Sequence, residues 1–242
     1  MTQKVLMYGG GGGIGSATAR LLRQQHYHLH LVGRDGSKLE PLADELGADY
    51  TVADIGDNDA FDRVAEEAGD VLNGLVYAIG TVNLRSLVRL SADDFLSDFR
   101  INAAGAALAV KAALPALKKS TQPASVVLFS SVAAGQGFSF HASTGMAKAA
   151  VNGLTLALAA ELAPGVRVNA IAPSLTNTPL AADILANEQL AQSIAKLHAM
   201  RRVGNAEDIA AMVAFLLSEQ AQWITGQIIG VDGGRSTLRI GA

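Results

Sequence analysis

A run of glycines near the start of the chain is the feature that most constrains its fold. Gly9 to Gly13, followed by Gly15, separate an apolar segment that ends at Tyr8 from an amphipathic segment that begins at Ile14. A strand, a glycine turn and a helix start in this order direct backbone N–H groups and the positive end of the helix dipole at one position. The sequence therefore predicts an anion site of the kind that holds the phosphates of a dinucleotide.

The glycine spacing permits two readings of this turn. Gly10, Gly12 and Gly15 match the pattern G-x-G-x-x-G, whereas Gly9, Gly13 and Gly15 match G-x-x-x-G-x-G. The uninterrupted run does not choose between them, and a flexible loop would also contain such glycines. Its position between the first strand and the first helix favours the phosphate-binding interpretation.

Short apolar runs alternate with longer amphipathic runs along nearly the whole chain, which is typical of strand–helix units on a parallel sheet. The expected strands are Lys4 to Tyr8, His28 to Val32, Tyr50 to Val52, Gly74 to Ala78, Ser125 to Ser130, Val166 to Ile171 and Gln227 to Val231. The expected helices are Ile14 to Gln25, Lys38 to Leu46, Asp59 to Ala68, Ala92 to Lys119, Ser143 to Leu162 and Glu207 to Ser218. We therefore expect a single α/β domain over residues 1–242, built on a doubly wound, seven-stranded parallel sheet.

The segment Pro179 to Met200 interrupts this alternation. Its apolar residues recur at helical spacing, yet it lies where the sheet needs a connection. A long excursion of this kind often closes over a binding site. We expect residues 179–200 to form a lid whose apolar side chains contact a partly hydrophobic substrate or pack on the sheet.

Composition narrows the classes of protein that fit. Half of the 242 residues are hydrophobic and 17% are charged, which suits a sheet buried on both faces and self-association. The formal charge of −3, without a basic cluster, argues against a nucleic-acid partner. The absence of cysteine excludes disulfides, thiolate metal sites and cysteine nucleophiles. The start of the sequence is too poor in apolar residues for a signal peptide, and no apolar run is long enough to span a membrane, so we expect a soluble, cytoplasmic protein.

The end of the second expected strand, Val32-Gly33-Arg34-Asp35, bears on the identity of the dinucleotide. A protein that prefers the unphosphorylated cofactor usually offers an acidic residue to the ribose hydroxyls at this point. Gly33 leaves space here, and Arg34 offers a permanently charged, planar group that suits a 2′-phosphate. Asp35, in contrast, favours the unphosphorylated cofactor. The alternative interpretation of Arg34 is a solvated surface charge that does not contact the cofactor. We expect NADP(H).

Motifs near the C-terminal end complete a pattern: Arg202-Val203-Gly204, Ile224-Thr225-Gly226-Gln227 and Val231-Asp232-Gly233-Gly234. With the glycine turn and Arg34, they make the chain resemble the short-chain dehydrogenase/reductase family over nearly its whole length. The resemblance implies a Rossmann-like fold, the G-x-x-x-G-x-G register, a small-molecule substrate and a homo-oligomer, either a dimer or a tetramer. The cofactor contacts that it implies are Gly9, Gly11, Gly12, Gly13, Ile14, Gly15, Arg34, Asp54, Ile55, Ala78, Ile79, Gly80, Lys148, Pro173, Leu175 and Thr178.

Two positions depart from the pattern of this family. Tyr8 stands where the family usually has a threonine, and Tyr77-Ala78-Ile79-Gly80 stands where it usually has Asn-Asn-Ala-Gly. Both changes remove hydrogen-bonding groups that brace the sheet around the cofactor. We expect these changes to affect the local geometry of the sheet around the cofactor more than cofactor binding itself.

The resemblance also implies a catalytic group of four residues. In the family, a serine positions the substrate oxygen, a tyrosine transfers the proton, a lysine four residues later lowers the pKa of the tyrosine and holds the ribose, and an asparagine supports a proton relay. The matching positions are Ser131, Thr144, Lys148 and Asn102. Threonine thus replaces the tyrosine, and an aliphatic hydroxyl lacks the acidity of a phenol near neutral pH.

His141 is a candidate to replace the tyrosine as proton donor. It lies seven residues before Lys148, so the two share a helix face if the helix begins early enough. Enoyl reductases of the wider family place a tyrosine at this spacing, and imidazole exchanges protons near neutral pH. The competing interpretation is a histidine that caps the helix or contacts the substrate.

The sequence therefore predicts an NADP(H)-dependent oxidoreductase that transfers a hydride to a carbonyl or a conjugated double bond. The alternative is a non-catalytic NADP(H)-binding sensor or inactive subunit, because the tyrosine is replaced. Cofactor-independent lyase chemistry fits the intact glycine turn and Arg34 less well. His26, His28 and His30 alternate at strand spacing, which could present three imidazoles to a metal. We nevertheless expect no metal site, because no carboxylate accompanies them and His26 is expected in the turn before the strand.

Overall fold

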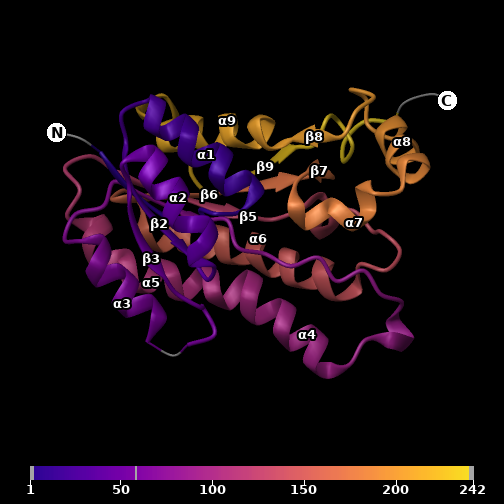
Figure 1. The fold of residues 1–242 in the computed structure, drawn as a ribbon, viewed down its shortest axis with the longest axis horizontal. Coiled ribbons are helices and arrows are strands. Elements are labelled where there is room, and N and C mark those ends of the chain that lie inside the picture. The colour runs from indigo at the N-terminus through magenta and orange to yellow at the C-terminus, as the bar shows by residue number, and fades with distance from the viewer. Residues whose placement is uncertain (1–2, 58, 240–242) are drawn as a thin grey trace.

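The computed structural model describes residues 3–57 and 59–239. The strands of its main sheet are β1 (Lys4–Tyr8), β2 (His28–Gly33), β3 (Asp49–Val52), β4 (Gly74–Tyr77), β5 (Ala124–Phe129), β6 (Val166–Pro173) and β9 (Ile228–Val231). They form an all-parallel sheet in the order β3-β2-β1-β4-β5-β6-β9. Figure 1 labels β2, β3, β5, β6 and β9 of this sheet. The doubly wound sheet expected from the sequence is confirmed, and each expected strand lies within two residues of an observed one.

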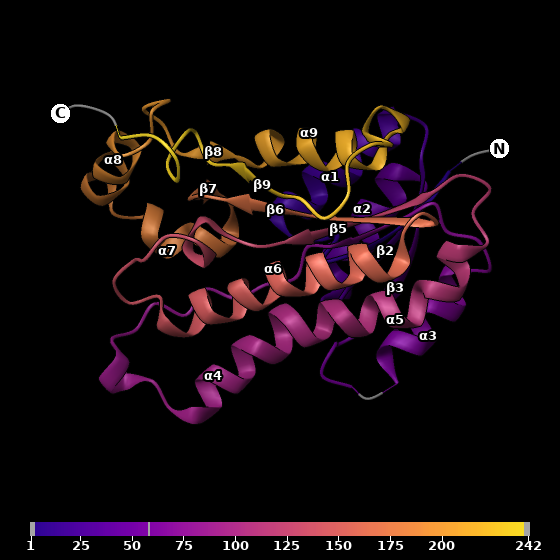
Figure 2. The ribbon, with the colours of Figure 1, turned by 180° about the vertical axis from the view of Figure 1, so that it is seen from behind.

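Helices cover both faces of the sheet. They are α1 (Gly13–Gln24), α2 (Gly36–Leu46), α3 (Ala60–Ala68), α4 (Ala92–Phe99), α5 (Gly105–Lys118), α6 (Ala142–Leu162), α7 (Ala182–Leu185), α8 (Glu188–Lys196) and α9 (Ala206–Leu217). The layer of α1, α2 and α9 packs on one face, and α3, α5 and α6 pack on the other (Figure 2). In the part of the chain that the structure describes, no helix combines the length and the apolar character that crossing a membrane requires.

The central strands are buried on both faces, which explains why they are continuous apolar runs in the sequence rather than alternating ones. All residues of β4 and β5 are buried. In β4, Leu75 and Tyr77 join the core beneath α3, α5 and α6, whereas Val76 joins the core beneath α1, α2 and α9. The two cores hold the strand ends in fixed positions.

The strand order opens a crevice next to β1. This strand pairs with β2 on one side and with β4 on the other, so the connections leave the sheet in opposite directions. Ligands of open parallel sheets bind at such a switch point, outside the carboxyl ends of the strands. The glycine turn follows β1 at this edge, and Ala78 to Gly80 follow β4.

Two expected helices differ in the structure. The run expected from Ala92 to Lys119 is divided by a π-helical segment, Arg100–Ala104, between α4 and α5. The run expected from Pro179 to Met200 is a 3-10 turn (Pro179–Ala181) followed by α7 and α8. The side chain of Asn187 accepts a hydrogen bond from the Leu190 amide and starts α8 as a new helix. Helical periodicity does not reveal either interruption, because the apolar spacing continues across both.

A small second sheet joins the two ends of this segment. It pairs β7 (Thr176–Asn177) with β8 (Gly204–Asn205) in parallel, and it was not expected from the sequence. The pairing holds the residues before and after residues 179–200 side by side. Residues 179–200, named the lid segment after the expectation from the sequence, are therefore a loop closed at its base.

Candidate active site

Three glycines of the turn have no room for a side chain. A Cβ on Gly15 would lie 2.1 Å from the carbonyl oxygen of Gly9, and one on Gly13 would lie 2.9 Å from the loop after β6. Gly9 itself has a φ of +80°, and a Cβ there would lie 2.8 Å from the backbone after β4. Gly10 and Gly12 would make milder contacts, at 3.2 Å. The steric requirement falls on the three glycines of the G-x-x-x-G-x-G pattern.

The same turn leaves the positive end of α1 open. Gly12 caps the helix without a side-chain hydrogen bond, and no acidic residue stands in the first turn. Gly11, Gly12 and Ile14 remain partly or fully exposed. Free N–H groups at a helix start, together with the helix dipole, attract phosphate groups. The turn therefore has the shape and the polarity of a diphosphate site.

Arg34 and Asp35 have different surroundings at the end of β2. Arg34 is exposed and forms no hydrogen bond or ion pair with another residue that the structure describes. The carboxylate of Asp35 accepts hydrogen bonds from the hydroxyl of Ser37 at 2.6 Å and from its amide at 3.1 Å, and lies 3.3 Å from Lys38 Nζ. These bonds, that of the Ser37 hydroxyl foremost, lower the pKa of Asp35. Asp35 is thus occupied as the N-cap of α2, while Arg34 has its charged group free.

The other positions expected to contact the cofactor lie along the same edge of the sheet. Asp54 is exposed just after β3, where its carboxylate accepts a hydrogen bond from the Gly56 amide at 2.8 Å. Ile55 packs on the core beneath α3, α5 and α6. Pro173 ends β6, Leu175 lies between β6 and β7, and Thr178 follows β7. All of them lie at or after the carboxyl ends of parallel strands.

The two unusual tyrosines pack against each other. The ring centroids of Tyr8 and Tyr77 are 5.7 Å apart, and both side chains are buried. The Tyr77 hydroxyl donates to the carbonyl oxygen of Ile101 at 2.7 Å, within the π-helical segment. A Cβ on Gly105 would lie 2.2 Å from this hydroxyl, so α5 can begin here only with glycine. Aromatic packing replaces the polar groups, and β1 and β4 keep their parallel register.

Gly80, Asn102 and Lys148 converge beside the end of β4. A Cβ on Gly80 would lie 3.1 Å from both Asn102 Oδ1 and Lys148 Nζ. Asn102 belongs to the π-helical segment, and its side-chain nitrogen donates to the Thr81 hydroxyl and to the Asp98 carbonyl oxygen, each at 2.8 Å. The wide π turn thus presents the asparagine to the strand ends, as π-helical turns often do at functional sites.

Lys148 is a buried lysine of α6, with 7% of its surface exposed. Its Nζ atom donates to the carbonyl oxygen of Phe129 at 2.8 Å, at the end of β5. Burial lowers the pKa of Lys148 to about 8, and the Asp98 carboxylate acts in the opposite direction. Ionisable groups with such shifts are concentrated at functional sites.

Ser131 and Thr144 use their hydroxyl groups differently. Ser131 Oγ accepts a hydrogen bond from the Ala133 amide at 3.1 Å, which leaves its proton free to donate to another oxygen. Thr144 is buried, and its Oγ1 accepts from the Asn83 amide at 3.1 Å and donates to the Asn83 carbonyl oxygen at 3.4 Å. Thr144 therefore holds the loop after β4 and presents no free hydroxyl.

His141 occupies the N-cap position of α6, so the two-turn spacing to Lys148 is kept. Its Nδ1 atom is hydrogen-bonded to the carbonyl oxygen of Ser139 at 2.8 Å, so Nδ1 carries the proton of the neutral ring. The ring also packs on Phe138, with centroids 5.4 Å apart. Among the described residues Nε2 has no hydrogen-bond partner, and the side chain is partly exposed.

Asp98 is a buried acid that sequence reasoning missed. It lies in the last turn of α4 with 3% of its surface exposed. Its carboxylate oxygens accept hydrogen bonds from the hydroxyls of Thr81 at 2.6 Å and Ser143 at 2.5 Å. The one available signal was the four-residue spacing to Asn102, which puts both residues on one helix face.

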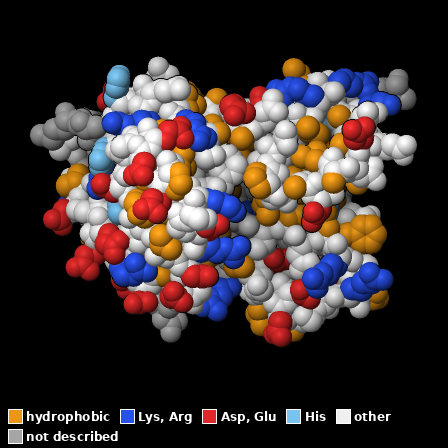
Figure 3. Space-filling view, viewed as in Figure 1, with side chains coloured by type: hydrophobic (Ala, Val, Ile, Leu, Met, Phe, Trp, Pro, Cys, Tyr) orange, Lys and Arg blue, Asp and Glu red, His pale blue; other side chains and the backbone are white. Residues whose placement is uncertain are grey.

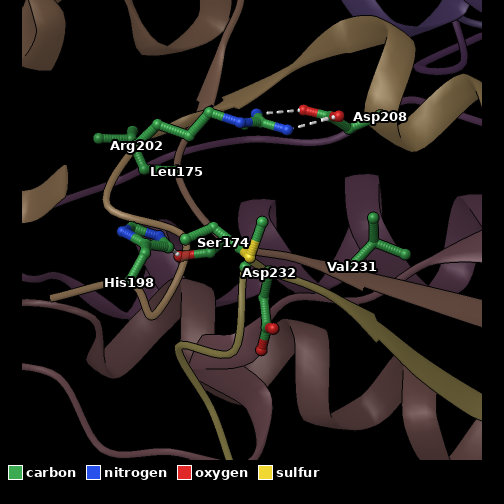
Figure 4. Close-up of a pocket in the computed structure, with 10 residues that line it drawn as sticks. Ser174, Leu175, His198, Arg202, Asp208, Val231 and Asp232 are labelled. Carbon is green, nitrogen blue, oxygen red and sulfur yellow. Dashed lines mark hydrogen bonds and ion pairs between the residues drawn. The ribbon is translucent and has the colours of Figure 1, made fainter. Parts of the chain in front are cut away.

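A pocket lies at the base of the lid segment (Figure 4). Its lining includes Ser174, Leu175, His198, Val231 and Asp232. The buried ring of His198 is hydrogen-bonded to the Ile194 carbonyl oxygen at 2.8 Å and to Ser174 Oγ at 2.9 Å. Across the pocket, Arg202 forms two hydrogen bonds with the carboxylate of Asp208, at 2.6 and 2.8 Å. These contacts anchor the C-terminal end of the lid segment.

The lid segment carries exposed apolar side chains. Leu180, Leu190, Leu197 and Met200 are each at least 45% exposed. In Figure 3, hydrophobic side chains gather on the right of the molecule, on the side of α7 and α8. Exposed apolar side chains that gather on one side of a molecule are typical of a binding or interaction site.

The alternating histidines have separate surroundings. His28 Nε2 lies 3.0 Å from the Asp49 carboxylate, so the expectation that no carboxylate accompanies them was wrong. The acid comes from the neighbouring strand β3, 21 residues away in sequence. His30 is buried beside Thr51, and burial lowers its pKa to about 4. In residues 3–57 and 59–239, no three or more histidine, cysteine or acidic side chains are grouped to hold a metal.

Comparison with known proteins identifies the family. Residues 10–236 match the family model described as Enoyl-(Acyl carrier protein) reductase. A 3-oxoacyl-(acyl-carrier-protein) reductase of Bos taurus is 33% identical over 241 residues, which cover 97% of this chain and 98% of that protein. A tropinone reductase homologue of Arabidopsis thaliana is 31% identical over 239 residues, which cover 95% and 88%.

Solved structures agree with the sequence relatives. A short-chain type dehydrogenase/reductase from Mycobacterium ulcerans matches with a TM-score of 0.92 and 31% identity, covering 98% of this chain and 90% of that one. ElxO with NADP bound matches with a TM-score of 0.90 and 28% identity, covering 98% and 100%. From the fold, the site and these relatives, the chain belongs to the short-chain dehydrogenase/reductase family of oxidoreductases.

Proposed function

We propose that the protein is an NADP(H)-dependent reductase that transfers a hydride to a carbonyl or a conjugated carbon–carbon double bond. The observation that carries the proposal is the arrangement at one edge of the sheet: a sterically required glycine turn, a free Arg34, and the convergence of Asn102 and Lys148. The first two features suit a phosphorylated dinucleotide, and the third suits proton chemistry next to it.

The residues present fit the cofactor. Gly9, Gly13 and Gly15 pack so closely against the surrounding chain that the turn has no room for side chains, and the open start of α1 provides N–H groups for the diphosphate. Arg34 has no other partner among the described residues, and its guanidinium group suits a 2′-phosphate. ElxO, a structural neighbour of this chain, was solved with NADP bound, which supports the proposal that this chain also binds NADP(H). When bound, the reduced nicotinamide supplies the hydride.

The chain's own residues supply the other functions. The free proton of Ser131 donates a hydrogen bond to the substrate oxygen and positions it. Lys148 binds the ribose hydroxyls through its ammonium group, and Asn102 Oδ1 lies beside it as a hydrogen-bond acceptor. The loop after β6, with Pro173, Leu175 and Thr178, contacts the nicotinamide end.

The proton donor is the feature in which this chain departs from its family. We assign position 144 as the counterpart of the family's tyrosine, and Thr144 is engaged by the backbone of Asn83 on both its donor and acceptor sides. His141 is the candidate donor, because its Nε2 has no partner among the described residues. A proton taken up from solvent on Nε2 makes the ring an imidazolium, which passes that proton to the substrate and returns to the neutral form. A non-catalytic binding protein would need no such group.

Residues 179–200 are proposed to close over the substrate. Their exposed leucines and Met200 suit a substrate with an apolar portion, and both ends of the segment are fixed, by the β7–β8 pair and by His198. Such a segment moves as a unit about its base.

Self-association as a dimer or tetramer is part of the proposal. Leu96, Phe99, Leu108 and Leu156 are exposed on α4, α5 and α6, which form one layer of the molecule. Sedimentation at micromolar concentration tests this point, and a monomer there would contradict it.

The function is tested in two steps. NADPH and NADH binding are first measured by fluorescence, and NADPH oxidation is then followed at 340 nm with quinones, ketones and enoyl thioesters. Tighter binding of NADPH and oxidation with at least one substrate class are expected. Tighter binding of NADH would contradict the cofactor assignment, and NADPH binding without turnover across the panel would favour the sensor or inactive subunit.

A further inference from the structure

The buried carboxylate of Asp98 has no ion-pair partner among the described residues. Its ligands are neutral: Thr81 donates to Oδ1 at 2.6 Å and Ser143 donates to Oδ2 at 2.5 Å. The Ser143 hydroxyl also lies 3.2 Å from the carbonyl oxygen of Asp94. A buried charge costs free energy unless hydrogen bonds and an opposite charge compensate it. The positive charge on which this carboxylate acts is that of Lys148, because Asp98 raises the pKa of this lysine.

The hydrogen bonds of this cluster run from Asn102, as donor, through the Thr81 hydroxyl to Asp98, as acceptor. Because the carboxylate can only accept, the Thr81 hydroxyl donates to it and is left to accept from the Asn102 side-chain nitrogen, at 2.8 Å. That nitrogen also donates to the Asp98 carbonyl oxygen at 2.8 Å. Both donors of the amide are thus used on the Asp98 side. The amide orientation is fixed, and Oδ1 is turned away from Asp98.

Oδ1 of Asn102 then lies on the side of Lys148. It accepts from the Thr81 amide at 3.4 Å, and it lies, like Lys148 Nζ, 3.1 Å from the point where a Gly80 Cβ would stand. The Nζ atom itself is hydrogen-bonded to the neutral carbonyl oxygen of Phe129. Asp98 is therefore the one charged group whose effect on Lys148 is resolved in the described part of the chain.

The cluster joins segments that are far apart in sequence. Asp98 belongs to α4, Thr81 to the loop after β4, Asn102 to the π-helical segment and Ser143 to the first turn of α6. An apolar side chain at position 98 would fill the space without the cost of a buried charge. The carboxylate does what an apolar residue cannot, because it accepts hydrogen bonds from two hydroxyl groups on different segments.

We propose that Asp98 is a positioning residue of the active site: through the Thr81 hydroxyl, its carboxylate fixes the side chain of Asn102 with Oδ1 facing Gly80 at the end of β4. The inference depends on the proposed function only in treating Asn102 as a site residue. Asp98 acts through Asn102 and touches neither substrate nor cofactor.

The test measures the mobility of the Asn102 side chain in the free protein by NMR. Solvent exchange of the Asn102 side-chain amide protons, assigned by their loss in Asn102→Ala, is compared in the wild type, in Asp98→Asn and in the control Asp93→Asn, which removes an exposed carboxylate from the same helix. We expect exchange about tenfold faster in Asp98→Asn and no change in the control. Unchanged exchange in folded Asp98→Asn would overturn the proposal.

A second variant covers the case in which Asp98→Asn does not fold. Thr81→Val removes the hydroxyl link between Asp98 and Asn102 and keeps both the shape of the side chain and the carboxylate. We expect the Asn102 side-chain amide protons to exchange with solvent about tenfold faster than in the wild type. Unchanged exchange would refute the link. Neither readout uses cofactor or turnover, so a failure of the proposed reductase activity would leave this test intact.

Discussion

Replacing Arg34 by glutamine should convert a preference for NADPH into near indifference between the two cofactors. The wild-type guanidinium group is exposed and has no hydrogen-bond or ion-pair partner among the described residues, so the substitution breaks no intramolecular contact. What is lost is a charge-assisted pair of hydrogen bonds to the 2′-phosphate, worth about 1.5–3 kcal/mol. The Kd for NADPH should rise by roughly 10- to 150-fold. Asp35 does not compensate, because Ser37 and Lys38 hold it at the start of α2.

The assay is fluorescence titration of both cofactors at fixed ionic strength, since screening weakens contacts between exposed charges. Lys118→Gln is the matched control, because it also removes one exposed positive charge. Lys118 lies in the last turn of α5, near the amino ends of the strands, whereas Arg34 follows the carboxyl end of β2. The Kd for NADH should change less than about twofold in both variants. An Arg34→Gln protein that keeps the wild-type ratio of the two Kd values would refute the assignment of Arg34 to the phosphate.

Three further predictions concern the turn, the proton donor and the core. Gly15→Ala should weaken NADPH binding by about 100-fold or more, because the new Cβ would lie 2.1 Å from the carbonyl oxygen of Gly9. The control Gly137→Ala should leave the Kd for NADPH unchanged, because nothing lies within 4 Å of its Cβ. Equal Kd values in the two variants would contradict the role of the turn. His141→Gln should lower kcat by about 100-fold at an unchanged Kd for NADPH, and an unchanged kcat would remove His141 from the proton transfer. Burial holds the pKa of His30 near 4, below its ordinary value of 6.5. As the pH falls, the unfolded chain therefore protonates this histidine before the folded chain does, and the free energy of unfolding decreases by about 3 kcal/mol between pH 6.5 and pH 4. Denaturant titrations should show a weaker pH slope in His30→Leu, and an equal slope would contradict the linkage.

The strands could be predicted because the sheet is buried on both faces. β4 and β5 must then be continuous apolar runs, and such runs are visible in one sequence. The interruptions of the helices could not be predicted in the same way. Asn187 caps α8 inside a segment whose apolar periodicity continues, and the π-helical turn at Arg100–Ala104 lies in a stretch with good helix formers on both sides.

The candidate site was predictable where its residues share one element. Thr144 and Lys148 are four residues apart on α6, and His141 precedes the helix by one position, so spacing alone related them. Asp98 and Ser143 are 45 residues apart, and His28 and Asp49 are 21 apart. Those contacts depend on the packing of α4 against α6 and on the pairing of β2 with β3. Long-range polar pairs of this kind leave no local pattern in a single sequence.

The contact between Tyr77 and Gly105 has a consequence for protein engineering. The hydroxyl of Tyr77 occupies the space that a side chain at position 105 would need, and its ring rests on Tyr8. Grafting the asparagine usual in the family onto position 77 alone would leave a void beside Tyr8 and deprive the Ile101 carbonyl oxygen of its donor. Exchanging Gly105 alone would force the phenol out of its place. Positions 8, 77 and 105 therefore form one epistatic unit, to be transplanted together between members of the family.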